Sequence, residues 1–147
     1  MTIPVLIPTD KIKDVENFVT DSIEKALKFS GNHYNLKDVL EQLYEDKAQL
    51  WILWNDKRKT KYQGCIVSKI LKRPNTKSLN LFIVTGKDRK LWQDKITIFE
   101  DYAKQKGCSH LETYARPGWS RILKKHNYKT THYLLEKKLE DLYVIWK

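Results

Sequence analysis

The sequence predicts a mixed α/β domain, and three observations carry this prediction. The chain has 147 residues, which is the size of one domain. Residues 50–54 form a continuous apolar run, typical of a buried strand. In the second half, short apolar runs alternate with stretches of helical periodicity, which favours a sheet containing a parallel pair. No repeat or linker divides the sequence, so we expect one domain over 1–147, with an apolar C-terminal tail at 141–147.

The first third is predicted to form an edge strand and two helices. Residues 4–8 are apolar but bracketed by prolines, which suits a strand at the edge of a sheet. Asp10 can cap a helix near 10–29, which Gly31 would end. Asn35 is then placed to cap a second helix.

The remainder is predicted to be an antiparallel hairpin followed by alternating strands and helices. Within the second strand, Gly64 marks a place where another backbone can pass closely. Gly107 is suited to the position just after the end of the longest helix. The expected strands are 50–54, 62–71, 79–85, 110–114 and 133–139, and the expected helices are 88–106 and 119–126.

Composition excludes several classes of protein. A hydrophobic content of 41% with 31% charged residues is typical of a globular chain. No apolar run approaches the roughly 20 residues that span a bilayer, and the first eight residues lack a basic region, so neither a membrane segment nor a signal peptide is expected. Two cysteines and four histidines without ligand-like spacing predict no disulfide framework and no metal site.

The net charge of +10 is concentrated in one segment. Residues 56–95 carry 12 Lys and Arg against 3 Asp and Glu, a local balance of +9. Such a segment attracts anions, which include a phosphorylated cofactor, nucleic acid or an acidic protein surface. Lysines far outnumber arginines, which favours phosphate attraction over the bidentate reading of bases.

The order of elements, with several short motifs, resembles the GNAT acetyltransferase superfamily, and most closely the GNAT-like proteins of tailed bacteriophages. The resemblance covers roughly residues 10–140 and implies a central, mostly antiparallel sheet with a splayed parallel pair, flanked by helices. The matching motifs are Gln49-Leu50-Trp51, Gly86 followed by Trp92, the stretch from Ala103 to Cys108, the Arg-x-Gly-Trp turn from Arg116 to Trp119, and a variant leucine-tyrosine-x-x-x-glycine-phenylalanine stretch from Ile122 to Tyr128.

The resemblance implies an acetyl-CoA site at the end of the third strand of the meander. The pantetheine would pair with the backbone there, and the pyrophosphate would lie at the N-terminus of the long helix, where free N–H groups and the dipole favour an anion. The expected cofactor-binding residues are Ile83, Val84, Thr85, Gly86, Lys87, Arg89 and Lys90.

Several positions depart from the family pattern. The two small residues of the family's phosphate-binding loop fall at Lys90 and Trp92, and the usual tyrosine acid falls at Leu123. Residues 62–86 contain no Asp or Glu, although the usual base is often a carboxylate on a meander strand. Tyr114 and Tyr128, with His110, are the groups that could transfer protons instead.

Three functions therefore stay open. The chain could be an N-acetyltransferase that moves acetyl from acetyl-CoA to an amine, a catalytically silent GNAT-fold structural or interaction protein, or a nonspecific nucleic-acid binder using residues 56–95. The apolar segment 142–146 suggests a protein partner or a homo-oligomer. A phage protein of this kind would be found in the host cytoplasm or in the virion.

Overall fold

The computed structural model describes residues 2–28, 33–55, 61–86, 95–114 and 117–139. The chain divides into two compact units, Met1–Tyr114 and Ala115–Lys147, which are described separately below. None of the described helices has both the length and the apolar character needed to cross a membrane. The predicted tail at 141–147 lies outside the described residues.

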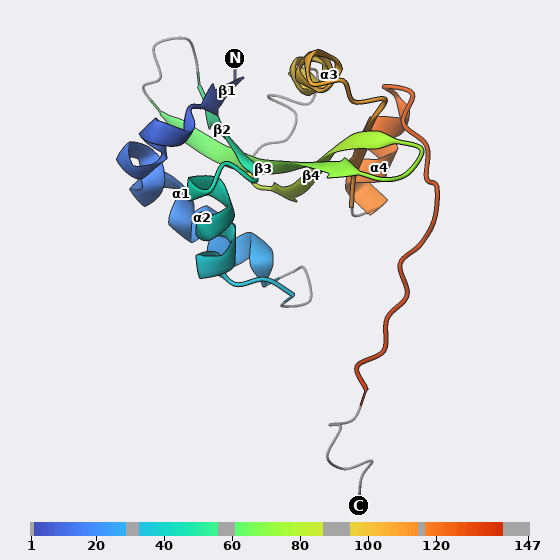
Figure 1. Cartoon of the computed structure of the whole chain (residues 1–147), viewed down its shortest axis with the longest axis horizontal. Helices are drawn as coiled ribbons and strands as arrows, with labels where there is room; N and C mark the ends of the chain where they lie inside the picture. Colours follow the sequence, from blue (N-terminus) through green and yellow to red (C-terminus); the bar gives the residue numbers. More distant parts are fainter. Residues whose placement is uncertain (1, 29–32, 56–60, 87–94, 115–116, 140–147) are drawn as a thin grey trace, which may run out of the picture. The chain divides into compact units, whose positions relative to one another are not determined.

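The first unit is built on a five-stranded sheet with the order β1-β2-β3-β4-β5 (Figure 1). The first four strands pair antiparallel with their neighbours, and β5 pairs parallel with β4. The predicted mixed sheet, mostly antiparallel with one parallel pair, is therefore confirmed. Its strands are β1 (Ile3–Ile7), β2 (Gln49–Trp54), β3 (Tyr62–Lys72), β4 (Lys77–Val84) and β5 (His110–Thr113).

Helices cover both faces of this sheet (Figure 1). Helices α1 (Ile12–Leu27) and α2 (Leu36–Tyr44) lie on one face, and α3 (Ile96–Gln105) lies on the other. On the α3 side, the buried ring of Trp51 packs edge-on against Phe99 at 4.7 Å and against Tyr102 at 5.1 Å between centroids. The core on the α1 and α2 side is made of buried apolar residues, among them Val19, Ile23, Val39, Leu43, Leu50, Ile52, Cys65, Val67 and Ile83.

Local sequence signals account for two of the helix ends. Asn35 starts α2 with a reciprocal capping box, in which its side chain accepts from the N–H of Asp38 and the Asp38 carboxylate accepts from the N–H of Asn35. At the end of α3, Gly107 adopts φ +78°, and the N–H of Cys108 donates to the carbonyl of Ala103 at 2.8 Å. Both predicted caps are confirmed, and the second is a Schellman motif.

The predicted cap at Asp10 is wrong. A 3₁₀ turn, η1 (Thr9–Lys11), precedes α1, and in it the N–H of Lys11 donates to the carbonyl of Pro8. This turn contains Asp10, so Lys11 occupies the capping position of α1 and makes no side-chain cap. Residues 87–94, which include the first part of the predicted long helix, lie outside the described residues.

The second unit contains α4 (Pro117–Lys124), close to the predicted short helix. Asn127 follows it with φ +69°, and the N–H of Tyr128 donates to the carbonyl of Leu123 at 3.1 Å. Asn127 thus occupies the left-handed position that a glycine usually holds after a helix.

The predicted final strand is wrong. Residues 128–139 form neither helix nor strand, and several of their apolar side chains are exposed. Apolar alternation gives a segment the capacity to pair but cannot supply a partner strand, and no described strand pairs with this segment.

Candidate functional site

The pairing of the parallel strands β4 and β5 ends before β4 ends, which marks the position of the predicted splay. Their register runs from Ser78 opposite His110 to Leu81 opposite Thr113, where the Thr113 hydroxyl also donates to the carbonyl of Leu81 at 2.8 Å. Strand β4 continues for three more residues, 82–84, without a partner on this side among the described residues. At the usual rise per residue, these leave about 10 Å of strand edge open.

A β-bulge lies at the same point on the other edge of β4. Val67 is opposite Ile83, but the next residue of β3, Ser68, is opposite Leu81. Phe82 is therefore the extra residue of the bulge. Because a bulge bends and twists its strand, the direction of β4 changes close to the point where its pairing with β5 ends.

The pairing with β3 determines which backbone groups of β4 are open. Thr85 donates its N–H to the carbonyl of Cys65 at 2.9 Å, and its hydroxyl accepts from the N–H of Cys65. Since antiparallel ladders alternate, the N–H and C=O of Val84 point to the opposite edge. Of the predicted residues Ile83, Val84 and Thr85, only Val84 offers an outward N–H, because Thr85 is already bonded to β3.

The chain leaves β4 through a close contact between two glycines. Gly64 has φ +152° and Gly86 has φ +148°. A Cβ built on Gly64 would come within 2.8 Å of both the Cα of Gly86 and the carbonyl oxygen of Thr85. The predicted close approach at Gly64 is therefore confirmed, and the backbone that approaches is the exit from β4.

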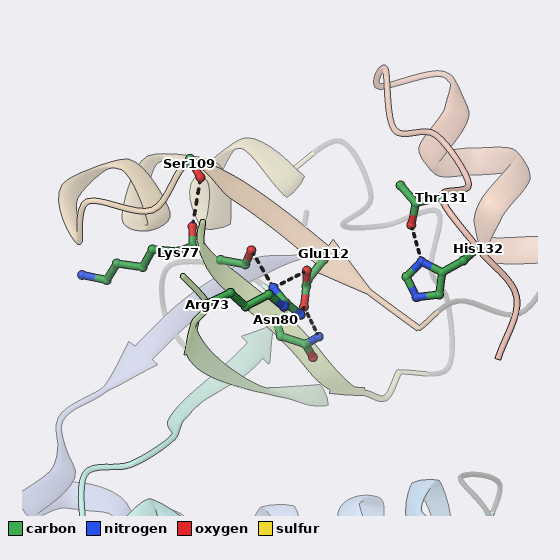
Figure 2. A network of polar contacts seen from close by, with 8 residues as sticks. Arg73, Lys77, Asn80, Ser109, Glu112, Thr131 and His132 are labelled. Atoms are coloured by element: carbon green, nitrogen blue, oxygen red, sulfur yellow. Dashed lines mark hydrogen bonds and ion pairs between the residues drawn. The ribbon is translucent and has the colours of Figure 1, made fainter. Parts of the chain in front are cut away.

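A polar network joins the β3–β4 turn to both strands below the splay (Figure 2). The guanidinium of Arg73 donates to both oxygens of Glu112 at 2.8 and 3.2 Å, and to the Ser78 hydroxyl at 3.2 Å. The side-chain N–H of Asn80 donates to Glu112 at 2.9 Å. Asn80 and Glu112 are register partners, one pair before the strands separate. The network therefore holds β4 to β5 immediately below the splay.

Glu112 is the functional candidate that sequence reasoning missed. Burial alone raises the pKa of its carboxyl, but hydrogen bonds from Arg73 and Asn80 and the charge of Arg73 outweigh burial and lower the pKa below the ordinary value. Residues 62–86 contain no carboxylate, and Glu112 lies beyond them on β5. The parallel pairing of β5 with β4 places Glu112 beside β4. In the sequence, Glu112 stands out as the one acidic residue in 110–114.

One further cation lies beside the bulge. The ammonium of Lys69 lies 4.4 Å from the ring centroid of Phe82 and 4.7 Å from that of Tyr34. The two rings are themselves 6.3 Å apart. This contact fixes a positive charge next to the extra residue of β4.

The predicted proton-transfer residues are not all in one unit. Tyr114 directly follows β5, is 69% exposed, and lies at the end of the strand pair where the splay opens. His110 begins β5, and its Nδ1 lies 2.8 Å from the Ser109 hydroxyl. Tyr128 belongs to the second unit, as does Leu123, which is buried at the position of the usual acid. In the same unit, the Thr131 hydroxyl and His132 Nδ1 are 2.9 Å apart (Figure 2).

The remaining predicted cofactor residues, Lys87, Arg89 and Lys90, lie outside the described residues, as does Trp92. Within the described part of the chain, no three His, Cys, Asp or Glu side chains are grouped as metal ligands would be. Two shallow depressions of about 370 and 330 Å³ lie elsewhere, one along α2 and one between β1 and the end of α3. Neither depression is lined by a residue of β4 or β5.

Comparison with protein-family models and with curated proteins gives no match. Solved structures do match over nearly the whole chain. The ribosomal-protein-alanine N-acetyltransferase of Brucella melitensis biovar Abortus 2308 has a TM-score of 0.65 at 13% identity, covering 96% of this chain and 100% of its own.

Two further solved structures with a similar fold carry different functional names. An aminoglycoside acetyltransferase from an uncultured soil metagenomic sample, solved with sisomicin, has a TM-score of 0.61 at 9% identity, covering 96% of each chain. A transcriptional regulator from Bacillus halodurans C-125 has a TM-score of 0.63 at 10% identity, covering 95% of this chain and 100% of its own. At such identities the likeness concerns the fold alone. With its parallel β4–β5 pair in a mixed sheet flanked by helices, the chain has the fold of the GNAT acetyltransferases.

Proposed function

We propose that this protein is an N-acetyltransferase that uses acetyl-CoA as donor and an amine as acceptor. The observation that carries the proposal is the open edge of β4 at the splay, where the N–H and C=O of Val84 point away from β3. An extended chain with amide groups, such as pantetheine, pairs with an edge of this kind. The acetyltransferase names among the structural neighbours support this reading.

The residues around the open edge fit the cofactor. Val84 is half-buried, whereas Ile83 is buried in the core and contributes no side chain. Gly86 gives the exit from β4 a backbone without a side chain, which favours close approach of a ligand. The bound cofactor supplies the acetyl group as a thioester. Lys87, Arg89 and Lys90 are proposed to attract its phosphates.

The proton chemistry of the site is proposed to be divided between two groups. Glu112 stays ionised because Arg73 and Asn80 stabilise the carboxylate, so it attracts a cationic acceptor and is a weak proton acceptor. Tyr114, exposed at the end of β5, is the described phenol best placed to exchange a proton with a reacting group at the splay. Tyr128 stays a candidate for the same role.

A second function, a catalytically silent GNAT-fold binding or structural protein, is favoured by one specific observation. The carboxylate that the structure describes beside the splay is already bonded to both Arg73 and Asn80. A site of that kind can bind a cofactor along the edge of β4 and still lack an efficient general base. We propose a phage-encoded protein in either case, as the resemblance of its motifs suggests, with the host cytoplasm or the virion as its location.

Nucleic-acid binding through residues 56–95 receives less support from the described side chains. Arg73 is bonded to Glu112, Lys77 donates to the carbonyl of Lys106, and Lys69 lies over two aromatic rings. The side chains of these three cations therefore already make contacts within the protein.

The proposal is tested with a pair of substitutions at one position. Val84→Pro removes the outward N–H, whereas Val84→Ala keeps it and serves as the matched control. Loss of one hydrogen bond of about 1 kcal/mol weakens acetyl-CoA binding by roughly fivefold for Val84→Pro but not for Val84→Ala. Binding is measured by calorimetry, with adenosine 3′,5′-bisphosphate as a control for simple attraction of anions to a basic protein. Equal binding of acetyl-CoA and this control would contradict the proposal.

Catalysis is tested separately, by release of free CoA in the presence of amine acceptors. Release that depends on the amine supports the transferase. Binding of acetyl-CoA at Val84 without any release favours the silent protein.

A further inference from the structure

At the end of β4, a side chain takes the place of a backbone group in the sheet. Val84 is the last residue of β4, and Thr85 follows it, facing Cys65 of β3. Two residues that form a hydrogen-bonded pair in an antiparallel ladder normally exchange two bonds, each from one N–H to the other carbonyl. Thr85 donates its N–H to the carbonyl of Cys65 at 2.9 Å, but the N–H of Cys65 donates to the Thr85 hydroxyl at 2.8 Å. The hydroxyl therefore replaces the Thr85 carbonyl in the ladder.

The Thr85 hydroxyl is fully bonded in this place. It accepts from the N–H of Cys65 and donates its own hydrogen to the carbonyl of Cys65 at 3.0 Å. Cys65 is completely buried, so its N–H depends on an acceptor within the protein, and the loss of that acceptor is costly. A valine in place of Thr85 has the same shape but supplies no acceptor.

The replacement releases the peptide that follows Thr85 from the ladder. The carbonyl oxygen of Thr85 lies beside Gly64, at 2.8 Å from the position of an added Cβ, and Gly86 adopts φ +148°. A bond from Cys65 to this carbonyl would keep the Thr85–Gly86 peptide in line with β4. The hydroxyl thus lets the chain turn at this point and fixes the direction in which it leaves the strand.

The direction of this exit matters for the proposed cofactor, and the inference rests on the proposed function. The pantetheine of acetyl-CoA is proposed to pair with Val84, before the turn. Its phosphates are proposed to be attracted by Lys87, Arg89 and Lys90, which follow Thr85 within five residues. The two halves of the cofactor are joined covalently, so they bind together only if the two parts of the protein are held at a matching separation.

We propose that Thr85 is a positioning residue for acetyl-CoA. By replacing its own carbonyl in the ladder, its hydroxyl sets the exit from β4 so that pantetheine and phosphates are bound at the same time. The hydroxyl acts through the backbone and takes no part in proton transfer. It should therefore matter for the joined cofactor and not for either half alone.

The test compares three ligands on the wild type, Thr85→Val and Thr85→Ser. The ligands are acetyl-CoA, S-acetylpantetheine, which lacks the phosphates, and adenosine 3′,5′-bisphosphate, which lacks the pantetheine. Thr85→Val should weaken acetyl-CoA binding by roughly tenfold and change the binding of each fragment by no more than about twofold. Thr85→Ser keeps the hydroxyl and should bind acetyl-CoA within about twofold of the wild type. Titration followed by calorimetry or NMR measures binding, and melting followed by circular dichroism confirms that the variants are folded.

Several outcomes would overturn the proposal. One is a Thr85→Val protein that binds acetyl-CoA as the wild type does. Another is equal weakening of acetyl-CoA and of either fragment, because that result means that the hydroxyl supports only one half of the site. A third is a Thr85→Ser protein as weak as Thr85→Val. A wild type that binds acetyl-CoA no more tightly than adenosine 3′,5′-bisphosphate would instead contradict the proposed function itself.

The structural basis is checked in the free protein, without any ligand. The amide of Cys65 should exchange faster with deuterium in Thr85→Val than in the wild type, and Thr85→Ser should restore slow exchange. An unchanged Cys65 amide in Thr85→Val would show that another group accepts its hydrogen, and it would overturn the proposal whatever the cofactor does.

Discussion

Gly64 on β3 faces Gly86, the residue where the chain leaves β4, so closely that a Cβ on Gly64 would lie 2.8 Å from the Cα of Gly86. The same added atom would lie 2.8 Å from the carbonyl oxygen of Thr85. Both atoms that it meets belong to the backbone and cannot rotate away. This contact therefore fixes the path of the chain just beyond the open edge of β4.

Gly64→Ala is expected to destabilise the protein by about 1–3 kcal/mol, because it adds a backbone clash to the strain of a positive φ. Gly107→Ala is the control, since its φ of +78° is also positive but an added Cβ meets only the flexible end of Lys77 at 3.7 Å. Urea unfolding measures both changes. A larger loss of unfolding free energy for Gly107→Ala would contradict the role given to the Gly64 contact.

The Arg73–Glu112 pair should make stability depend on pH in acid. The folded state lowers the pKa of Glu112 below the ordinary 4.5, so the stabilisation is complete above that value and is lost as the pH falls through the lower folded value. Glu112→Gln should remove this part of the acid sensitivity and, because the pair is about one-third to one-half exposed, cost only about 0.2–1 kcal/mol at neutral pH.

Urea unfolding at a series of acid pH values measures this difference, with the exposed residue changed in Glu24→Gln as control. The profile of Glu112→Gln should be flatter than those of the wild type and the control. Identical profiles for all three proteins would show that the contact contributes nothing to acid sensitivity.

Asn127 should tolerate glycine better than alanine. Its φ of +69° costs alanine about 1 kcal/mol, whereas glycine adopts it freely. Asn127→Ala should therefore speed deuterium exchange at the Tyr128 N–H, which donates to the carbonyl of Leu123, and Asn127→Gly should leave it unchanged or slower. Equal exchange in the two variants would mean that this residue does not end α4 in the left-handed conformation.

Among the aromatic side chains on the α3 side of the sheet, Trp51 is expected to contribute most to the free energy of unfolding. Its Nε1 donates to the Ser68 hydroxyl at 3.0 Å, and that hydroxyl donates in turn to Gln49 at 2.8 Å. Trp51→Leu removes two ring contacts and one buried hydrogen bond, for an expected loss of about 3–5 kcal/mol in the free energy of unfolding. Ser68→Ala, which removes only the hydroxyl, should cost about 1–2 kcal/mol. A loss for Trp51→Leu no larger than that for Ser68→Ala would contradict the packing described.

The helix caps were predicted correctly because Asn35 and Gly107 act within one turn of their helices. Gly64 was predicted from its residue type, because only a residue without a side chain fits there, although the backbone that it meets belongs to Thr85 and Gly86. Glu112 was missed because its partner Arg73 lies 39 residues away and is reached only through parallel pairing.

The final strand was predicted wrongly for a related reason. Alternating apolar residues at 133–139 signal a capacity for pairing, but the partner of a strand is a property of the whole fold. The bulge at Phe82 is a register shift between β3 and β4 next to the splay. No local pattern in the sequence of β4 predicts it.

The open edge of β4 is tested most directly by amide exchange at Val84 and Thr85, with and without saturating acetyl-CoA. The account predicts that the Val84 amide exchanges fast in the free protein and slowly in the complex. The N–H of Thr85 already donates to the carbonyl of Cys65, so it should exchange slowly both in the free protein and in the complex. A Val84 amide that is protected before the cofactor is added, or that is unaffected by it, would contradict the account.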